Sequence, residues 1–313
     1  MRLKALSHYN NDITTRFGDC ILLYDSATVV VYDCGHTDHA QRVKSFLAAR
    51  LVISQVHIVI SHNDSDHTSG IVELLDYLHI KRYTVTVYSS LYLKHTEKIL
   101  EQLDDERRTS KATKQHVLDT FDKIAEIVEK AEEYGFSVVD AIEHIQVASL
   151  CWIVGPREDE FIKVVAQAIE DDTITRIEGE TVMNAASVQL KCKLDNGQTV
   201  LLCGDASPSY LHRLDSYDVI QLPHHGRLDN AQEIFEELRD PYSKVYFISD
   251  NTGAGANSGG SDDLVRFMKR ENYSPALNTQ KGEVNLPKEG AQGETGNNRP
   301  QGVKLGGVDI RRG

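Results

Sequence analysis

Three apolar segments of the chain each end in histidine or aspartate side chains, and this feature most constrains how the chain folds. The segments and the residues that follow them are 58–61 before His62-Asn-Asp64-Ser-Asp66-His67, 199–203 before Gly204-Asp205, and 217–222 before Pro223-His224-His225-Gly226. Short β-branched runs that end at Gly, Pro or Asp are typical of strands. Polar residues at the carboxyl ends of strands project into ligand sites. We therefore expect the three clusters to meet at one edge of a sheet layer.

Strand and helix patterns alternate along the chain. Predicted strands lie at residues 20–24, 28–32, 56–61, 83–88, 187–194, 199–203, 217–222 and 244–249. Apolar residues repeat at helical spacing from Val117 to Ala131, which predicts a helix over about 114–133, and a second helix is expected near 158–169. The apolar stripe needs a partner. We favour the main core, and a second copy of the chain is the alternative.

Composition limits the classes of protein. The 313 residues are 40% apolar and 26% charged, which predicts a packed globule. A net charge of −13 argues against a surface that coats nucleic acid, although it leaves a local basic groove open. Neither a membrane span nor a signal peptide is visible in the sequence. Five widely spaced cysteines without a C-x-x-C pair favour free thiols and a cytoplasmic location.

The cluster after residue 61 carries the strongest chemical signal. Its two histidines and two aspartates are metal-ligand types, because imidazole suits zinc, iron or manganese and carboxylates suit harder divalent ions. The spacing lets His62 and Asp64 converge on one point and Asp66 and His67 on a second. A solvated loop with Asp66 as a helix N-cap is the alternative. Three strands that all end in such side chains favour a metal centre.

On these motifs the chain resembles the metallo-β-lactamase superfamily, and within it the hydrolase domain of ComEC-type competence proteins. Two further segments carry the resemblance, Phe17-Gly18-Asp19-Cys-Ile-Leu-Leu23 and Val29-Val-Val-Tyr-Asp33-Cys-Gly35. The resemblance spans roughly residues 18–269. It implies a four-layer αββα sandwich over residues 1–277, with a helical insertion at about 94–180 that forms a lid, a homodimer interface or a partner surface. Residues 278–313 are rich in Gly, Asn and Gln and are expected to form a flexible tail.

The resemblance also implies roles for the residues of the clusters. His62 and Asp64 would hold one metal ion, Asp66 and His67 a second, and Asp205 would bridge the two. Either His224 or His225 would be a further direct ligand of the second metal ion; we favour His224, which leaves His225 as a proton donor near the substrate. Asp33 would orient a ligand histidine, and Arg227 would contact a substrate phosphate or simply lie exposed in a loop.

One ligand position departs from the family pattern. Many members place a histidine where this chain has Asn184, and an amide oxygen is a poorer ligand for zinc. One of the two expected Zn²⁺ or Mn²⁺ ions is therefore expected to bind weakly. We also expect no late histidine ligand, because no histidine follows His225.

The expected activity is a metal-dependent phosphodiesterase or nuclease that uses a hydroxide bridging the two ions, with Asp66, His225 and Asn184 at the reacting centre. Its substrate would be a small phosphodiester or a short single strand of nucleic acid. The first alternative is a hydrolase of a small ester, lactone or thioester, since one fold serves many chemistries. The second is a metal-poor, non-catalytic binding or regulatory module.

Overall fold

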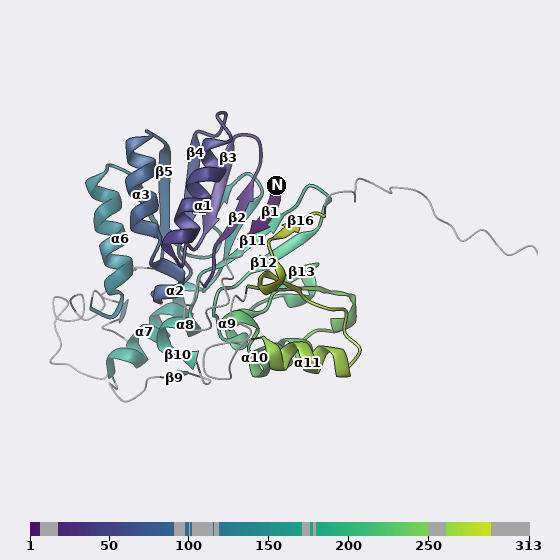
Figure 1. Ribbon diagram of the computed structural model, residues 1–313. Coiled ribbons are helices and arrows are strands. Elements are labelled where there is room, and N and C mark those ends of the chain that lie inside the picture. Colours follow the sequence, from purple (N-terminus) through teal and green to yellow (C-terminus); the bar gives the residue numbers. More distant parts are fainter. Residues whose placement is uncertain are drawn as a thin grey trace, which may run out of the picture.

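The computed structural model describes residues 1–6, 18–90, 98–99, 101, 115, 119–170, 176–177, 180–249 and 261–288. These residues form two seven-stranded sheets that pack face to face, with helices on the outer face of each sheet (Figure 1). The arrangement is the four-layer αββα sandwich that the sequence predicts.

The first sheet has the strand order β16-β1-β2-β3-β4-β5-β6. Strands β16, β1, β2 and β3 pair antiparallel, and β3 to β6 run parallel, so the strand ends before residues 33, 60 and 90 lie at one edge. Its strands are β1 (Arg2–Ala5), β2 (Ile21–Tyr24), β3 (Thr28–Tyr32), β4 (Gln55–Val59), β5 (Thr84–Ser89), β6 (Ser137–Asp140) and β16 (Val284–Leu286).

The second sheet repeats this plan, with the order β15-β14-β13-β12-β11-β8-β7. Strands β7, β8, β11 and β12 pair antiparallel, and β12 to β15 run parallel. Its strands are β7 (Gln146–Ala148), β8 (Cys151–Gly155), β11 (Gln189–Lys193), β12 (Thr199–Leu202), β13 (Val219–Gln221), β14 (Val245–Ile248) and β15 (Leu277–Asn278). A separate pair consists of β9 (Arg176–Ile177) and β10 (Glu180–Thr181).

The helices cover the outer faces or connect the sheets. Those on the first sheet are α1 (Thr37–Ala48), α3 (Ile71–Ile80) and α6 (Asp122–Glu133); those on the second are α10 (Leu228–Glu237) and α11 (Asp262–Arg270). Shorter or connecting helices are α2 (Ser65–Thr68), α7 (Glu158–Glu170), α8 (Val182–Ala185) and α9 (Pro223–Gly226). Single 3₁₀ turns are Pro208–Tyr210, Leu214–Ser216, Pro241–Ser243 and Thr279–Lys281.

The strands carry two apolar faces, which explains their near-continuous apolar sequences. In β3, Val29 and Val31 face the helices, whereas Val30 and Tyr32 face the second sheet. Side chains of a strand alternate between its two faces, so a strand covered on both sides must be apolar throughout. Three clusters of buried side chains result, one between the sheets and one under each helical layer.

Helix α6 packs on the core of the first sheet. Its residues Ile124, Ile127 and Ala131 are buried in the same cluster as the helices α1 and α3. Among the described residues, the apolar stripe is therefore covered by the chain itself, as favoured from the sequence. Helix α6 itself begins at Asp122. In the earlier part of the expected helix, residues 115, 119 and 120 are helical, and Lys114 and Val117 lie outside the described residues.

Residues 94–180 are more than the helical insertion that the sequence predicts. Strand β6 completes the first sheet, and β7 and β8 belong to the second, so this segment crosses from one sheet to the other. These strands are only three to five residues long. Their patterns are too short to stand out from the surrounding helical sequence.

The tail expected over residues 278–313 was placed too early in the chain. Asn278 ends β15, and β16 pairs antiparallel with β1, where Leu286 lies opposite Leu3. Val284 and Leu286 are buried in the cluster between the sheets, while Asn285 is exposed. Two buried residues suffice for an edge strand but give no detectable periodicity. Residues 289–313 of the expected tail lie outside the described residues.

In the part of the chain that the structure describes, no helix is both long and apolar enough to cross a membrane. All five cysteines are buried and free.

Candidate metal centre

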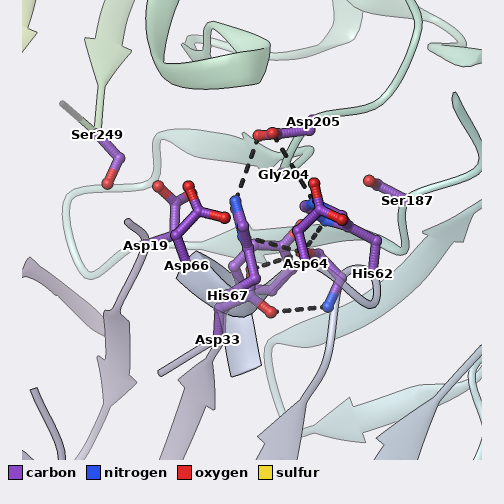
Figure 2. A network of polar contacts seen from close by, with 12 residues as sticks. Asp19, Asp33, His62, Asp64, Asp66, His67, Ser187, Gly204, Asp205 and Ser249 are labelled. Atoms are coloured by element: carbon purple, nitrogen blue, oxygen red, sulfur yellow. Dashed lines mark hydrogen bonds and ion pairs between the residues drawn. The ribbon is translucent and has the colours of Figure 1, made fainter. Parts of the chain in front are cut away.

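The polar clusters that follow the parallel strands meet at one edge of the sandwich, where both sheets end (Figure 2). In the first sheet, Asp33 follows β3, and His62, Asp64, Asp66 and His67 follow β4 and extend into α2. In the second sheet, Asp205 follows β12, His225 follows β13 and Ser249 follows β14. The three clusters predicted from the sequence therefore share one place.

Two glycines allow the backbones to approach closely here. Gly18 has a φ of +58°, and a Cβ on it would lie 1.6 Å from the carbonyl oxygen of Asp66. Gly204 has a φ of +52°, and a Cβ on it would lie 2.8 Å from the Cβ of Ser61. No side chain fits at either position without displacing the backbone that carries the cluster. Each glycine is followed by an aspartate that belongs to the centre.

One group of side chains is called the His67 half of the centre. It consists of Asp66, His67, Asp205 and His225. The Nε2 atom of His67 lies 3.5 Å from Asp205 Oδ1, and that of His225 lies 3.3 Å from Asp66 Oδ2. Behind His67, the Nδ1 atom lies 2.8 Å from Asp33 Oδ2, and Asp33 in turn accepts hydrogen bonds from the Ser61 amide and hydroxyl. A buried carboxylate therefore fixes the ring and directs Nε2 into the centre.

His62, Asp64 and Asp205 form the His62 half. The Nε2 atom of His62 lies 3.7 Å from Asp64 Oδ2 and 3.8 Å from Asp205 Oδ2. Behind this ring, Nδ1 lies 2.9 Å from the hydroxyl of Ser61. A neutral hydroxyl thus takes the place that a carboxylate takes behind His67. Asp64 is also the most open member, with 44% of its side chain exposed.

Asp205 is central to both halves. Its carboxylate lies within 4.0 Å of Nε2 of His62, His67 and His225, and its side chain is 4% exposed. Figure 2 shows it facing His62 and His67 from across the cluster. This is the position that a bridging ligand would need.

Oδ1 of Asp19 is buried at the edge of the cluster and has no hydrogen-bond partner among the described residues. The same holds for three atoms at the centre: Nε2 of His62, Nε2 of His67 and Oδ1 of Asp205. Burying polar atoms without partners is costly, and native structures contain few. These three are imidazole and carboxylate ligand atoms that all lie within 4.8 Å of one another. A divalent cation would satisfy all of them, so the residues fit a metal ion well.

The electrostatics of the cluster follow from its excess of carboxylates. Burial by itself lowers the pKa of His67, but Asp205 and Asp33 outweigh it and raise that pKa to about 10. Burial also lowers the pKa of His225, but Asp205, Asp19 and Asp66 outweigh it and raise that pKa well above its usual value. Conversely, burial would raise the pKa of Asp66, but hydrogen bonding to His225 and the charge of His67 hold it far below its usual range. Excess negative charge is what a cation site requires.

The structure brings His225, rather than His224, to the acidic cluster. Both residues have left-handed backbone conformations, with φ of +51° and +55°. The rings therefore diverge, at an interplanar angle of 84°, and only His225 lies within 4.0 Å of Asp66 and Asp205. The residue order of a tight left-handed turn gives no hint of which ring points inward. The sequence alone consequently could not choose between them.

Asn184 and Arg227 make other contacts. Asn184 lies in the short helix α8 and is buried, and its backbone carbonyl accepts hydrogen bonds from the amide and hydroxyl of Ser187. Arg227 lies at the start of α10, and its guanidinium pairs with Asp229 at 2.5 Å. A substrate phosphate would compete with that carboxylate for Arg227.

Sequence reasoning gave no role to Asp19 or Gln221, which lie directly behind the cluster. Asp19 is 1% exposed, and its Oδ1 lies 3.3 Å from His225 Nδ1. Although burial by itself raises the pKa of Asp19, His225 and His67 lower it to about 2. Gln221 donates a hydrogen bond to Asp19 Oδ2 at 2.6 Å. The available signal was Gly18-Asp19 before a strand, which has the same two residues as Gly204-Asp205.

Comparisons with known proteins agree with this architecture. Residues 13–151 match the family model described as the metallo-beta-lactamase superfamily. No curated protein matches the sequence.

Among solved structures, the chain is similar to the metallo-beta-lactamase fold protein YhfI from Bacillus subtilis, with 13% identity, 88% of this chain and 95% of that chain covered, and a TM-score of 0.41. It is also similar to the short form of human tRNase Z, with 16% identity, 74% and 80% covered, and a TM-score of 0.39. Both TM-scores lie below 0.5, so neither likeness bears on the function. The family match covers residues 13–151, less than half of the 313 residues, so over that segment the chain is similar to the metallo-β-lactamase superfamily.

Proposed function

We propose that the chain is a metal-dependent phosphodiesterase or nuclease that holds two divalent ions, Zn²⁺ or Mn²⁺, at the shared edge of its sheets. The observation that carries the proposal is the convergence of buried, unpartnered ligand atoms from His62, His67 and Asp205. The ligand set is rich in carboxylates, which suits hard or borderline ions. Such a pair of ions suits phosphoester chemistry, where both the attacking and the leaving oxygen need stabilisation.

In this proposal, the His67 half holds one ion through Asp66, His67 and His225, and the His62 half holds the other through His62 and Asp64. Asp205 contacts both ions. His225 replaces His224 as the ligand because its Nε2 faces Asp66 and Asp205. His224, half-buried beside it, then becomes the candidate proton donor to the leaving group. The His62 half has fewer ligands, consistent with Asn184 in place of a histidine.

Bound ions would supply an activated water and would offset the charge of a phosphodiester. The chain supplies position and charge. Asp33 accepts from Nδ1 of His67, which leaves Nε2 free of its proton and directed inward when an ion is bound. The five aspartates 19, 33, 64, 66 and 205 carry five negative charges, which would offset the four positive charges of two divalent ions held by neutral histidines. Arg227 would release Asp229 to hold a substrate phosphate with its planar fork.

The proposed substrate is a small phosphodiester or a short single strand of nucleic acid. The net charge of −13 opposes binding along a long duplex. We also propose that the ComEC-type hydrolase domains are the nearest branch, on the aspartate at position 64 and the motifs around Gly18 and Asp33. A reducing, cytoplasmic compartment is proposed because all five cysteines are free. A homodimer through the helical insertion gains no support from α6, whose apolar stripe packs on the core.

The test is hydrolysis of bis-p-nitrophenyl phosphate and of a labelled single-stranded oligonucleotide, with Mn²⁺ or Zn²⁺ and then with a chelator. Asp66→Ala and His67→Ala should abolish metal-dependent cleavage of both substrates. Two matched controls are His144→Ala and Asp263→Ala, which remove the same residue types from exposed positions. Both controls should retain wild-type rates.

Each failure has a distinct meaning. If metal-loaded wild-type protein cleaves neither phosphodiester but hydrolyses a carboxyl ester or thioester, the phosphodiesterase proposal is wrong and the ester hydrolase replaces it. If the protein binds less than about half an equivalent of metal after reconstitution, the enzyme proposals both fail. The non-catalytic module would then be the better account.

A further inference from the structure

Asp19 contacts the centre from the opposite side to Asp33. Its carboxylate is buried, and Figure 2 shows it on the side of Asp66 and Ser249. Oδ1 faces Nδ1 of His225 at 3.3 Å, and the carbonyl oxygen of Ser249 accepts from the same nitrogen at 2.9 Å. Nδ1 of His225 therefore donates to Ser249 and faces Asp19. Nε2 faces Asp66 at 3.3 Å and Asp205 at 4.0 Å.

The other oxygen of Asp19 is fixed by the second sheet. Gln221, at the end of β13, donates from Nε2 to Asp19 Oδ2 at 2.6 Å. The same amide accepts at Oε1 from the Cys203 backbone at 3.0 Å and from the Gly204 backbone at 3.4 Å. Gln221 is 2% exposed. One buried amide thus joins Asp19 to the strand end that carries Asp205.

The backbone of Asp19 is fixed as firmly as its side chain. Its amide donates to the carbonyl oxygen of Asp66 at 3.0 Å, and its own carbonyl accepts from the amide of Gly35 at 2.9 Å. Both of these partners belong to the first sheet's half of the molecule. Asp19 therefore sits where the loops of Asp66, Asp205 and His225 come together.

We propose that Asp19 is a positioning residue that orients His225 toward the second ion and, through Gln221, fixes the strand end of Asp205 against the loop of Asp66. This inference rests on the proposed metal site and deepens it. Asp19 places a carboxylate behind His225, as Asp33 does behind His67, although the Ser249 carbonyl is the closer acceptor for Nδ1 of His225. A negative charge behind a ligand imidazole makes the ring a better ligand, and losing such a partner costs about 10–100-fold in metal affinity.

The first experiment needs no metal. Ring-nitrogen NMR of the ¹⁵N-histidine-labelled full chain, at one fixed pH, compares wild type with Asp19→Asn and Asp33→Asn. The two variants remove the same buried carboxylate from behind different histidines. Asp19→Asn should shift the Nδ1 resonance of His225 more than the ring resonances of His67, whereas Asp33→Asn should shift those of His67 more. If Asp19→Asn leaves the His225 resonances at their wild-type positions, the positioning role is wrong.

The second experiment measures Zn²⁺ affinity by competition with a chromophoric chelator. Asp19→Asn should weaken the tighter site by about 10–100-fold. If Asp19→Asn does not fold, Gln221→Met serves, because it removes the hydrogen bond to Asp19 without placing a charge; we expect several-fold weaker binding. An affinity within twofold of wild type in whichever of these variants folds overturns the proposal. If wild-type protein binds no metal, the proposed function fails, while the NMR comparison still decides the role of Asp19.

Discussion

The two halves of the centre share Asp205 but differ in what lies behind their histidines. In the His67 half, Nδ1 of His67 faces the Asp33 carboxylate and Nδ1 of His225 faces that of Asp19. In the His62 half, Nδ1 of His62 meets the Ser61 hydroxyl. A carboxylate strengthens an imidazole ligand more than a hydroxyl does. The difference predicts that the proposed ions would be held tightly in one half and weakly in the other, although both halves use the same residue types.

Ligand number sharpens the same contrast. In the proposed site, the His67 half has four ligands: Asp66, His67, His225 and Asp205. The His62 half has three: His62, Asp64 and Asp205. Asp64 is also partly exposed, so water competes for its oxygens. We therefore expect the His67 half to fill first and to hold its ion more firmly.

Removing the shared ligand should erase the difference between the halves. Asp205→Asn takes away the one carboxylate that lies within 4.0 Å of all three histidines. Because both ions lose a ligand, we expect phosphodiesterase activity to fall by more than about 100-fold, beyond the effect of changing a supporting residue. Activity and bound metal, measured against the exposed control Asp263→Asn, check this. Retention of two tightly bound ions would contradict the central place of Asp205.

Removing the carboxylate behind His67 should weaken the His67 half more than removing the Ser61 hydroxyl weakens either half. Asp33→Asn should weaken binding in the His67 half by about 10–100-fold. Ser61→Ala removes a hydroxyl that contacts both His62 and Asp33, so a smaller loss in both halves is expected. Calorimetric titration of Zn²⁺ into each variant gives the affinities. Equal losses of Zn²⁺ affinity in the two variants would mean that the Asp33 carboxylate supports its histidine no better than the Ser61 hydroxyl does.

The pH dependence of metal binding should reveal the charged histidines. In the metal-free protein, Asp205 and Asp33 outweigh burial and raise the pKa of His67 to about 10 from 6.5. The stability that this protonated ring contributes is complete below pH 6.5 and is lost as the pH rises through 10. A metal ion needs the neutral ring, so binding between these limits releases a proton. Affinity should rise by about tenfold per pH unit for each proton displaced.

Titrations in buffers of different ionisation enthalpy count the protons released at pH 7.5. The raised pKa values of His67 and His225 predict release of at least one proton as the His67 half fills. Binding without proton release would show that these rings are already neutral. It would thereby contradict the excess of negative charge that we assign to the metal-free centre.

A histidine at position 184 should narrow the difference in metal affinity between the two halves. Asn184→His restores the residue that many superfamily members carry at this position, and an imidazole is a better ligand than an amide oxygen. We expect the weaker site to gain affinity on the order of tenfold, with the tighter site unchanged. Asn184→Gln is the matched control, since it enlarges the buried side chain without adding an imidazole. Equal affinities in the two variants would place residue 184 outside the His62 half.

The sequence predicted the parts of the fold that have long, doubly buried strands. Residues 28–32 and 199–203 read as strands because both of their faces are apolar, and the structure has them as β3 and β12. Strands β6, β7 and β16 escaped prediction because three or four residues carry no clear alternation. Their place depends on partner strands far away in the chain. Pairing, rather than local propensity, forms them.

The site was predictable where it follows the strands and unpredictable where it depends on backbone geometry. Residue type alone is enough to recognise the motif from His62 to His67 and the strand end at Gly204-Asp205. The choice of His225 over His224 depends on two successive left-handed residues. Asp19 and Gln221 meet only in the folded chain, 202 positions apart. A buried amide between two loops leaves no local pattern.

The most direct test of the two unequal halves is a calorimetric titration of metal-free wild-type protein with Zn²⁺ and, separately, with Mn²⁺. We predict two binding events per chain with clearly different affinities. Asp33→Asn should weaken the tighter event, and His62→Ala should remove the weaker one. Two events of equal affinity, or loss of the tighter event in His62→Ala, would contradict the account.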